Sequence, residues 1–221
     1  YEFEKKNLVV SLYRPFYKSH LYFDKDLNAM LYQNKKIFPN PNLENKIICV
    51  SGIGGSKDFS ALISSNVPIL HVVENGQSFP LYYYEENISA QKGLFDKGNE
   101  SEYIRRDAIT DFIYERAKKQ YGKSVTKEDI FYYVYGFLHS KEYRETFAND
   151  LKKKLPRLPL VESVPDFWAF SKAGRQLADL HLNYESVASY KGVITMFNPL
   201  NITDTLKQAN KEELEYLNYR V

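Results

Sequence analysis

The glycine-rich stretch Ser51–Lys57 has the residue types of a phosphate-binding loop. Its glycines would let the backbone approach a phosphate closely, and Lys57 would add positive charge. A Walker loop, however, has four residues between its first glycine and its Gly-Lys pair, and a dinucleotide-binding loop has a third glycine in front of a helix. Here the glycines stand closer together, and a run typical of a strand, Phe59–Ser64, follows. We therefore interpret the stretch as a hairpin turn.

Other patterns resemble catalytic motifs but are incomplete. Asn198–Asn201 keeps only the first half of the Asn/Asp-Pro-Pro-aromatic tetrapeptide with which adenine methyltransferases hold a flipped base, so it predicts a turn. Pro165-Asp166 lacks the downstream Glu-x-Lys with which restriction nucleases grip a metal ion, and Asp166 is better explained as a helix-start residue. The histidines have no close ligand spacing, and we interpret each as structural: His20, His71, His139 and His181. The sequence thus predicts no catalytic residue and no metal site.

The single cysteine, Cys49, lies in the apolar run Ile47–Val50. One cysteine can form neither an intrachain disulfide nor a cysteine cluster for a metal, and apolar surroundings make it a poor nucleophile. This usage predicts an intracellular, cytoplasmic protein. No apolar stretch nears the roughly 20 residues that cross a bilayer, so we expect no membrane span. Because the chain opens at Tyr1 without an initiating Met or a leader, we expect a fragment of a longer protein.

Composition predicts a globular protein with no strong charge signature. The 221 residues are 43% hydrophobic and 26% charged, and the net charge is +2, which by itself does not indicate a nucleic-acid partner. Two blocks are locally basic: residues 1–60 carry nine Lys and Arg against six Asp and Glu, and residues 101–160 carry thirteen against nine. Any surface for an anionic partner should draw on these blocks. We attribute the many Tyr and Phe residues mainly to codon bias.

Residues 1–95 have the pattern of strands separated by turns. Beta-branched and aromatic runs alternate with Asn, Pro and Gly, as in Asn75-Gly76. The predicted strands are Leu8–Leu12, His20–Asp24, Lys46–Ser51, Phe59–Ser64, Leu70–Val73 and Phe79–Tyr84. This part should form a mostly antiparallel sheet.

From residue 103 to residue 186 the apolar spacing becomes helical. The first predicted helix is Asp107–Tyr121, which Gly122 ends. The second begins at Thr126, which forms a capping box with Asp129. The third begins at Ser140 and has Tyr143, Phe147 and Leu151 on one face, and the fourth runs from Pro165 towards Tyr184. Residues 187–221 should add a strand, Tyr190–Phe197, and a terminal helix, Asn210–Tyr219. The fold class is α+β: a sheet-rich N-terminal half and a helical C-terminal half within one domain.

Three stretches together resemble one family in order and spacing. They are Tyr13–Phe16 with His20–Asp24, then Asp129–Ser140 with its continuation to Leu160, and Ala173–Glu185. The family is the C-terminal target-recognition (specificity) domain of Type ISP restriction-modification enzymes, long bacterial chains that combine a nuclease, an ATP-driven motor, an adenine methyltransferase and this domain. Family members usually continue past the final strands into a further helical segment, whereas this chain ends with Glu215–Val221.

The resemblance implies sequence-specific binding of double-stranded DNA, which would position a target adenine for an upstream N6-adenine methyltransferase. It implies no enzyme activity and no cofactor for this fragment; S-adenosylmethionine, ATP and Mg are expected for the parent enzyme. The partners would be duplex DNA and the methyltransferase domain of the same parent chain. Two alternatives stay open: a non-catalytic docking module that packs on the methyltransferase or motor without reading sequence, and an enzyme with an unrecognised active site.

Base reading in the major groove needs forks such as Arg to guanine, while Lys and Ser mainly hold phosphates. The candidate DNA contacts are Arg14, Lys18, Ser56, Lys57, Arg105, Arg106, Arg175 and Lys191. For each the competing explanation is a solvent-exposed side chain or an internal ion pair, and Arg175, lodged among helical core residues, is the one most expected to be structural. For Tyr132, Tyr133 and Tyr135 we favour packing over contact with bases.

Overall fold

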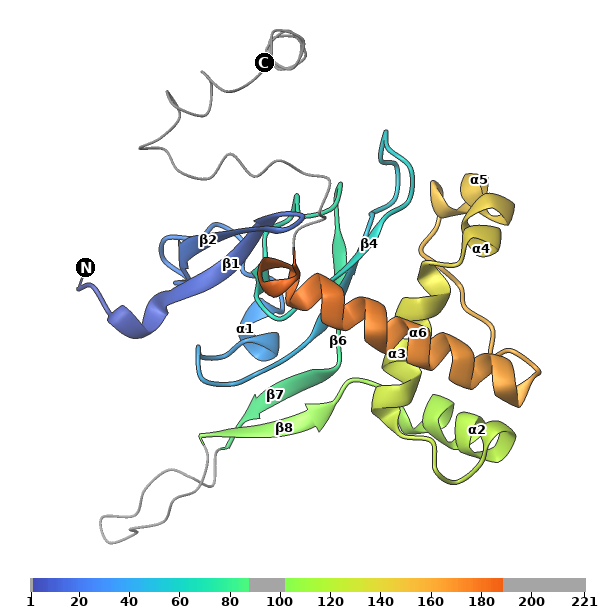
Figure 1. Cartoon of the computed structure of the whole chain (residues 1–221). Helices are drawn as coiled ribbons and strands as arrows, with labels where there is room; N and C mark the ends of the chain where they lie inside the picture. Colours follow the sequence, from blue (N-terminus) through green and yellow to red (C-terminus); the bar gives the residue numbers. More distant parts are fainter. Residues whose placement is uncertain (1, 88–101, 189–221) are drawn as a thin grey trace, which may run out of the picture. The chain divides into compact units, whose positions relative to one another are not determined.

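A computed structural model of the chain describes residues 2–87 and 102–188. The chain divides into two compact units, residues 1–185 and residues 186–221, and the description below concerns the first of them. Strands occupy its first part and helices its second, as Figure 1 shows. The predicted α+β class with mostly antiparallel sheets is confirmed.

The first sheet is built on a hairpin. After a short 3-10 turn at Lys5–Asn7, β1 (Leu8–Arg14) pairs antiparallel with β2 (Tyr17–Tyr22), and β5 (Val67–Pro68) adds to β1 in parallel. Phe16 in the two-residue turn has φ +58°, a left-handed conformation that is rare for a bulky side chain. The sheet order is therefore β2-β1-β5.

The second sheet has order β4-β3-β6 and carries the centre of the core. Its strands are β3 (Ile47–Val50), β4 (Ala61–Ser64) and β6 (Gln77–Pro80), all antiparallel. Every residue of β3 is buried: Ile48 and Val50 face one apolar cluster, and the alternate residues face another. Both faces of this sheet are thus covered, which explains why β3 reads as a continuous apolar run rather than an alternating one.

At Leu81 the chain passes from the second sheet to a separate ribbon. Leu81 is 2% exposed; its N–H donates to the Lys46 carbonyl and its own carbonyl accepts from Ala108. Beyond it, β7 (Tyr82–Glu86) pairs antiparallel with β8 (Tyr103–Asp107). The β7–β8 ribbon therefore begins directly beside Lys46, the residue that precedes β3.

In the described part of the chain, a one-turn helix precedes β3 and five α-helices form most of the C-terminal half. They are α1 (Asn34–Ile37), then α2 (Asp111–Tyr121), α3 (Lys127–Leu138), α4 (Lys141–Thr146), α5 (Ala148–Leu151) and α6 (Val164–Leu182), with a final 3-10 turn at Tyr184–Ser186. In Figure 1, α6 crosses α3. The two backbones meet at Gly136 and Gly174, where an added Cβ would collide with backbone atoms of the other helix.

Local signals set the ends of these helices. Thr126 accepts from the Asp129 N–H while the Asp129 carboxylate accepts from the Thr126 N–H, so the predicted capping box is confirmed. Gly122 ends α2 at φ +108°, which glycine tolerates best. Ser140 caps α4 as predicted, and Ser163 caps α6.

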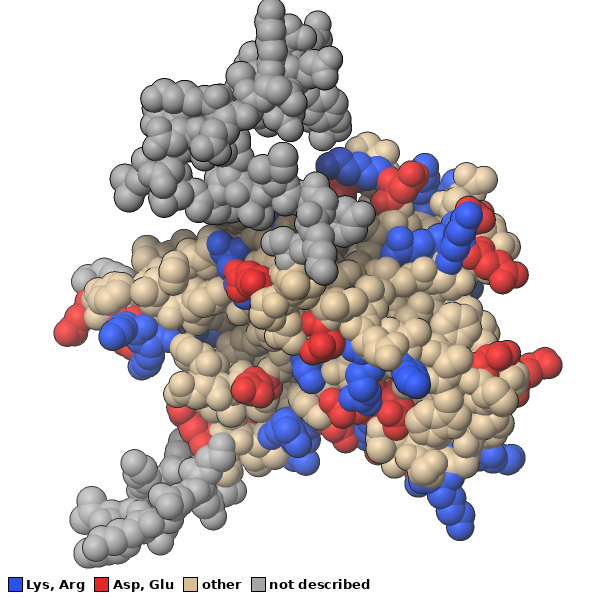
Figure 2. Space-filling view, viewed as in Figure 1, with Lys and Arg blue, Asp and Glu red and all other residues tan. Residues whose placement is uncertain are grey.

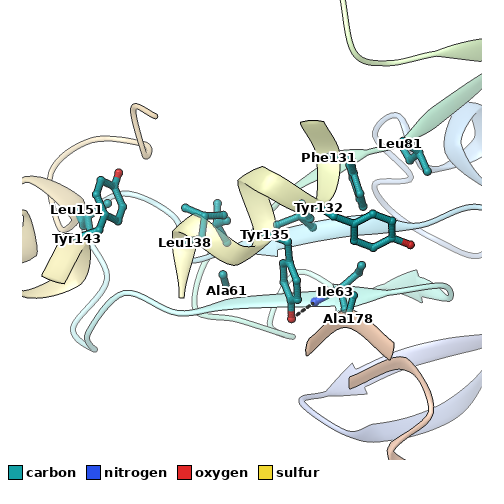
Figure 3. Packing of buried hydrophobic residues seen from close by; sticks show 12 residues of the cluster. Ala61, Ile63, Leu81, Phe131, Tyr132, Tyr135, Leu138, Tyr143, Leu151 and Ala178 are labelled. Atoms are coloured by element: carbon teal, nitrogen blue, oxygen red, sulfur yellow. Dashed lines mark hydrogen bonds between the residues drawn. The ribbon is translucent and has the colours of Figure 1, made fainter. Parts of the chain in front are cut away.

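The three tyrosines of α3 lie in the core, as we expected: Tyr132, Tyr133 and Tyr135 are 4%, 1% and 0% exposed. Figure 3 shows how Tyr135 reaches the sheet: its hydroxyl accepts from the Ile63 N–H, 3.1 Å away, among apolar side chains of α3 and β4. A polar group can enter this core because it has a partner there.

Several predicted boundaries were wrong. Leu70–Val73 is a turn and not a strand: Val72 and Val73 are buried in the core, Leu70 is 50% exposed, and the segment does not pair with a neighbouring strand. The predicted strand Phe79–Tyr84 is divided at Leu81 between two sheets. The chain bends at Phe147, so that Tyr143 and Leu151 lie on two short helices rather than one.

The helical part does not begin at residue 103, because Tyr103–Asp107 is strand β8, and α2 starts only at Asp111. Pairing with β7, which is distant in sequence, decides the conformation here. The predicted strand Tyr190–Phe197 and helix Asn210–Tyr219 lie outside the described residues.

Candidate nucleic-acid interface

Cations lie over tyrosine rings in two sets of contacts, one on the β7–β8 ribbon and one where Lys46 and α6 meet α3. We call these five residues the cation–tyrosine ladder: Arg105, Tyr82, Lys46, Tyr132 and Arg175. The guanidinium carbon of Arg105 lies 4.3 Å from the centre of the Tyr82 ring. At the other end, Lys46 Nζ and the guanidinium carbon of Arg175 lie 5.7 and 4.1 Å from the centre of the Tyr132 ring. The three cations come from segments far apart in sequence.

Strand geometry decides which β8 arginine joins the ladder. Side chains alternate between the faces of a strand, so Arg105 and Arg106 point to opposite faces. Arg105 is the register partner of Tyr84 and shares a face with Tyr82. Arg106 lies on the other face, where its Nε donates to Oε2 of Glu85 over 3.0 Å.

The first turn of α3 fixes the other end of the ladder. Arg175 on α6 lies 3.6 Å from a Glu128 oxygen and 3.1 Å from an Asp129 oxygen. Glu128 also lies 3.8 Å from Lys46 Nζ, so one carboxylate is shared by two cations. These ion pairs agree with the expectation that Arg175 makes structural contacts. They are partly exposed, and pairs of this kind position side chains more than they stabilise a fold.

Lys46 was missed by sequence reasoning. Burial alone would lower the pKa of Lys46, but hydrogen bonding to Tyr132 and the charges of Tyr132 and Glu128 outweigh it and raise that pKa. Lys46 therefore stays charged inside the ladder. A lysine at the start of a buried strand gives no periodic signal, and only the partners across space reveal its role.

A second group of predicted contacts lies on the β1–β2 hairpin. The guanidinium carbon of Arg14 is 4.6 Å from the centre of the Tyr13 ring, and its Nη1 donates to the His71 carbonyl over 3.2 Å. Lys18 donates to Oε2 of Glu185 over 2.6 Å. Among the described residues, no ion pair or ring contact joins these cations to the ladder.

The loop between β3 and β4 is a connection between antiparallel strands, as the turn interpretation predicted. Glu74 occupies it. The Ser56 hydroxyl donates to one Glu74 oxygen over 2.9 Å, and the Lys57 N–H donates to the other over 2.8 Å. These backbone and side-chain hydrogen bonds lower the pKa of Glu74. The Glu74 carboxylate thus already accepts from the Ser56 hydroxyl and the Lys57 N–H, donors that a phosphate would need, while the Lys57 side chain remains exposed.

Comparison with known proteins identifies the family. The model of the Type ISP C-terminal specificity domain matches residues 1–219. The chain belongs to this family. No curated protein matches the sequence.

Three solved structures are similar to this specificity domain. A cryoEM DrdV–DNA complex is 37% identical with a TM-score of 0.74, covering 86% of this chain and 17% of that one. A nuclease-deletion mutant of the Type ISP restriction-modification enzyme LlaGI, in complex with a DNA substrate mimic, is 35% identical with a TM-score of 0.67 and coverages of 87% and 15%. The ATP-dependent Type ISP restriction-modification enzyme LlaBIII, bound to DNA, is 30% identical with a TM-score of 0.73 and coverages of 87% and 12%. The chain thus spans less than a fifth of the length of each.

The predicted contacts of the specificity domain fall into separate groups. The ladder brings together Arg105 and Arg175, while Arg106 lies on the opposite face of β8. The hairpin and the β3–β4 loop hold the others, and Lys191 lies outside the described residues. In Figure 2, basic and acidic side chains are interleaved in the middle of the face that carries α3, α6 and β8.

The described residues contain little that suggests catalysis. Within residues 2–87 and 102–188, no three His, Cys, Asp or Glu side chains are placed to hold a metal ion, and no helix is long and apolar enough to cross a membrane. Burial raises the pKa of Cys49 to about 11, so its thiol stays protonated at neutral pH. What the arrangement offers instead is a set of oriented hydrogen-bond donors.

Proposed function

We propose that this specificity domain reads a particular sequence of duplex DNA for a Type ISP restriction-modification enzyme. The observation that carries the proposal is the family match over residues 1–219. DNA-bound relatives that are 30–37% identical over most of the chain add support. A domain of this family that is present in DNA complexes of three relatives is expected to share their ligand.

The geometry adds a physical reason. Arg14 and Arg105 each lie over a tyrosine ring, and neither pairs with a carboxylate among the described residues. A guanidinium held on an aromatic face is pre-oriented, so less entropy is lost when its N–H groups bind acceptors. Such groups suit recognition of DNA better than flexible, fully solvated lysines do.

The finer part of the proposal concerns the parent enzyme. The domain would position a target adenine for an N6-adenine methyltransferase domain that precedes it in the same chain. S-adenosylmethionine, ATP and Mg would serve that parent enzyme, and no step of catalysis is assigned to this domain. As a bacterial enzyme that acts on DNA, it would work in the cytoplasm.

Selection from randomised duplexes tests the proposal. The 221-residue chain is incubated with the pool at two salt concentrations, and bound duplexes are sequenced. We expect enrichment of one short asymmetric site, with affinities that fall as salt rises but keep their order, because phosphate contacts are sequence-independent and base contacts are not. No duplex binding, or salt-sensitive binding without preference, would contradict sequence reading.

Adenine positioning has its own test. The selected site should contain one adenine that the parent enzyme methylates at N6, always at the same place in the site. Replacing that A·T pair should abolish methylation while the rest of the site still binds. Methylation at scattered adenines would contradict positioning by this domain.

The docking alternative rests on one observation, the apolar side chains that the β1–β2 hairpin exposes. Leu8, Val10 and Tyr17 are 41%, 42% and 60% exposed. If the chain binds the isolated methyltransferase domain tightly but binds duplexes without preference, this alternative replaces DNA reading.

A further inference from the structure

Two neighbouring arginines of β8 are held in different ways. Arg106 donates from Nε to Glu85 on one face of the β7–β8 ribbon. Arg105 points to the other face, where its guanidinium lies over the Tyr82 ring and pairs with no carboxylate of residues 2–87 or 102–188. Arg105 therefore keeps free the Nε donor that Arg106 has already committed to Glu85.

Contact with the Tyr82 ring restrains the guanidinium of Arg105 and leaves its edges exposed. The N–H groups of a guanidinium lie in its plane, and adjacent pairs of them match two acceptors that stand side by side. DNA offers two such acceptor pairs: N7 and O6 of guanine in the major groove, and the oxygens of a phosphate.

The carboxylates that pair with the other two cations of the ladder favour a base edge over a phosphate as the ligand of this surface. The other two cations of the ladder, Lys46 and Arg175, share Glu128, and Arg175 also pairs with Asp129. Figure 2 shows that basic and acidic side chains are interleaved on this face. Carboxylates repel a phosphate, whereas a base edge carries no net charge and its amino groups can donate to a carboxylate.

We propose that Arg105, held over Tyr82, reads the N7 and O6 edge of one guanine in the recognised sequence, and that Arg106 does not contact DNA bases. The proposal rests on the proposed function, since it assigns a reader to a domain that reads duplex DNA. It predicts that the recognised site contains a G·C pair whose identity depends on this one side chain.

The test uses Arg105→Lys and, as the matched control one residue away, Arg106→Lys. Both variants keep the charge, but lysine lacks the two-pronged donor, so the comparison separates a fork from a positive charge. The wild-type chain first selects its site from randomised duplexes. Binding of all three chains is then measured to that site and to each of its single base-pair substitutions, with thermal unfolding as the check on folding.

We expect Arg105→Lys to lose about 5- to 150-fold of discrimination at one G·C pair and to keep it elsewhere. Arg106→Lys should keep the whole profile. The inference is overturned if Arg105→Lys keeps the profile, if it weakens every duplex equally as the loss of a phosphate contact would, or if Arg106→Lys has the same effect. In those cases the wild-type preference still stands. A wild-type chain without any preference would instead overturn the proposed function.

Discussion

Tyr133 and Tyr135 on α3 use the tyrosine side chain differently from the two ladder tyrosines, Tyr82 and Tyr132. Tyr133 and Tyr135 are enclosed, and their hydroxyls make the useful contacts: Tyr133 donates to the Pro159 carbonyl and Tyr135 accepts from the Ile63 N–H. In the ladder the ring faces matter, because Tyr82 and Tyr132 each lie under a cation. Tyrosine content therefore says little about DNA contact until burial and partners are known.

The same difference separates the region that identifies the family from the region that we propose contacts DNA. The α3–α6 crossing contains much of the sequence that resembles Type ISP enzymes, and its features are caps, glycine contacts and buried rings. Arg105 lies instead on a ribbon with no such signature. Substitutions in the crossing should destabilise the domain strongly, whereas substitution of Arg105 should leave it folded.

The largest effect is expected where α3 and α6 touch. In Gly174→Ala the new methyl group would collide with the backbone at Tyr132 and Gly136, so the helices must separate. We expect a loss of about 3 kcal/mol or more in the free energy of unfolding, measured by urea denaturation. Gly55→Ala is the control, because its new methyl group meets only the Glu74 side chain and no backbone atom. Equal losses in both variants would mean that the crossing is not closely packed.

A smaller loss should follow removal of one buried hydroxyl. Tyr135→Phe leaves the Ile63 N–H without its acceptor and His181 Nδ1 without its hydroxyl partner, 2.5 Å away. Leaving the buried Ile63 N–H and the partly buried His181 Nδ1 unpaired should cost about 1–3 kcal/mol of unfolding free energy. Tyr133→Phe, the control, frees only the Pro159 carbonyl and should cost about 1 kcal/mol. A ranking in which Tyr133→Phe costs more would contradict the role given to Tyr135.

Acid should weaken the same part of the core. Burial lowers the pKa of both His139 and His181 below their usual value of about 6.5. Both side chains are therefore neutral in the folded protein and bind protons more readily when the protein is unfolded. Their contribution to the free energy of unfolding is complete above about pH 6.5 and is lost as the pH falls towards their folded pKa values. Urea denaturation from pH 7.5 to 5 should show this decline, and His139→Gln should flatten it. If the decline in stability is unchanged in His139→Gln, other titrating groups cause it.

How far the sequence could predict this structure depends on the range of the contacts. The capping box at Thr126 and the stop at Gly122 are set by residues within one turn, and both were predicted correctly. Strand β8 and the role of Lys46 depend on partners brought together only by folding, and both were missed. The alternation of side chains along a strand does predict that Arg105 and Arg106 point to opposite faces. Which of the two keeps its hydrogen-bond donors free depends on the register between β8 and β7.

The smallest effect on stability is expected in the ladder. Glu128→Gln removes the carboxylate that Lys46 and Arg175 share. Because these pairs are partly exposed, the free energy of unfolding should fall by less than about 1 kcal/mol. Affinity for all duplexes should rise slightly if the ladder contacts DNA as proposed, since one negative charge beside it is removed.

Glu142→Gln is the matched control, because Glu142 is an exposed acid on α4, outside the ladder. It removes the same charge and should leave duplex affinity nearly unchanged if α4 faces away from the DNA. Equal gains in affinity from the two variants would show an effect of net charge alone. A loss of stability well above about 1 kcal/mol in Glu128→Gln would show that the ladder belongs with the core of α3, because exposed ion pairs do not contribute that much.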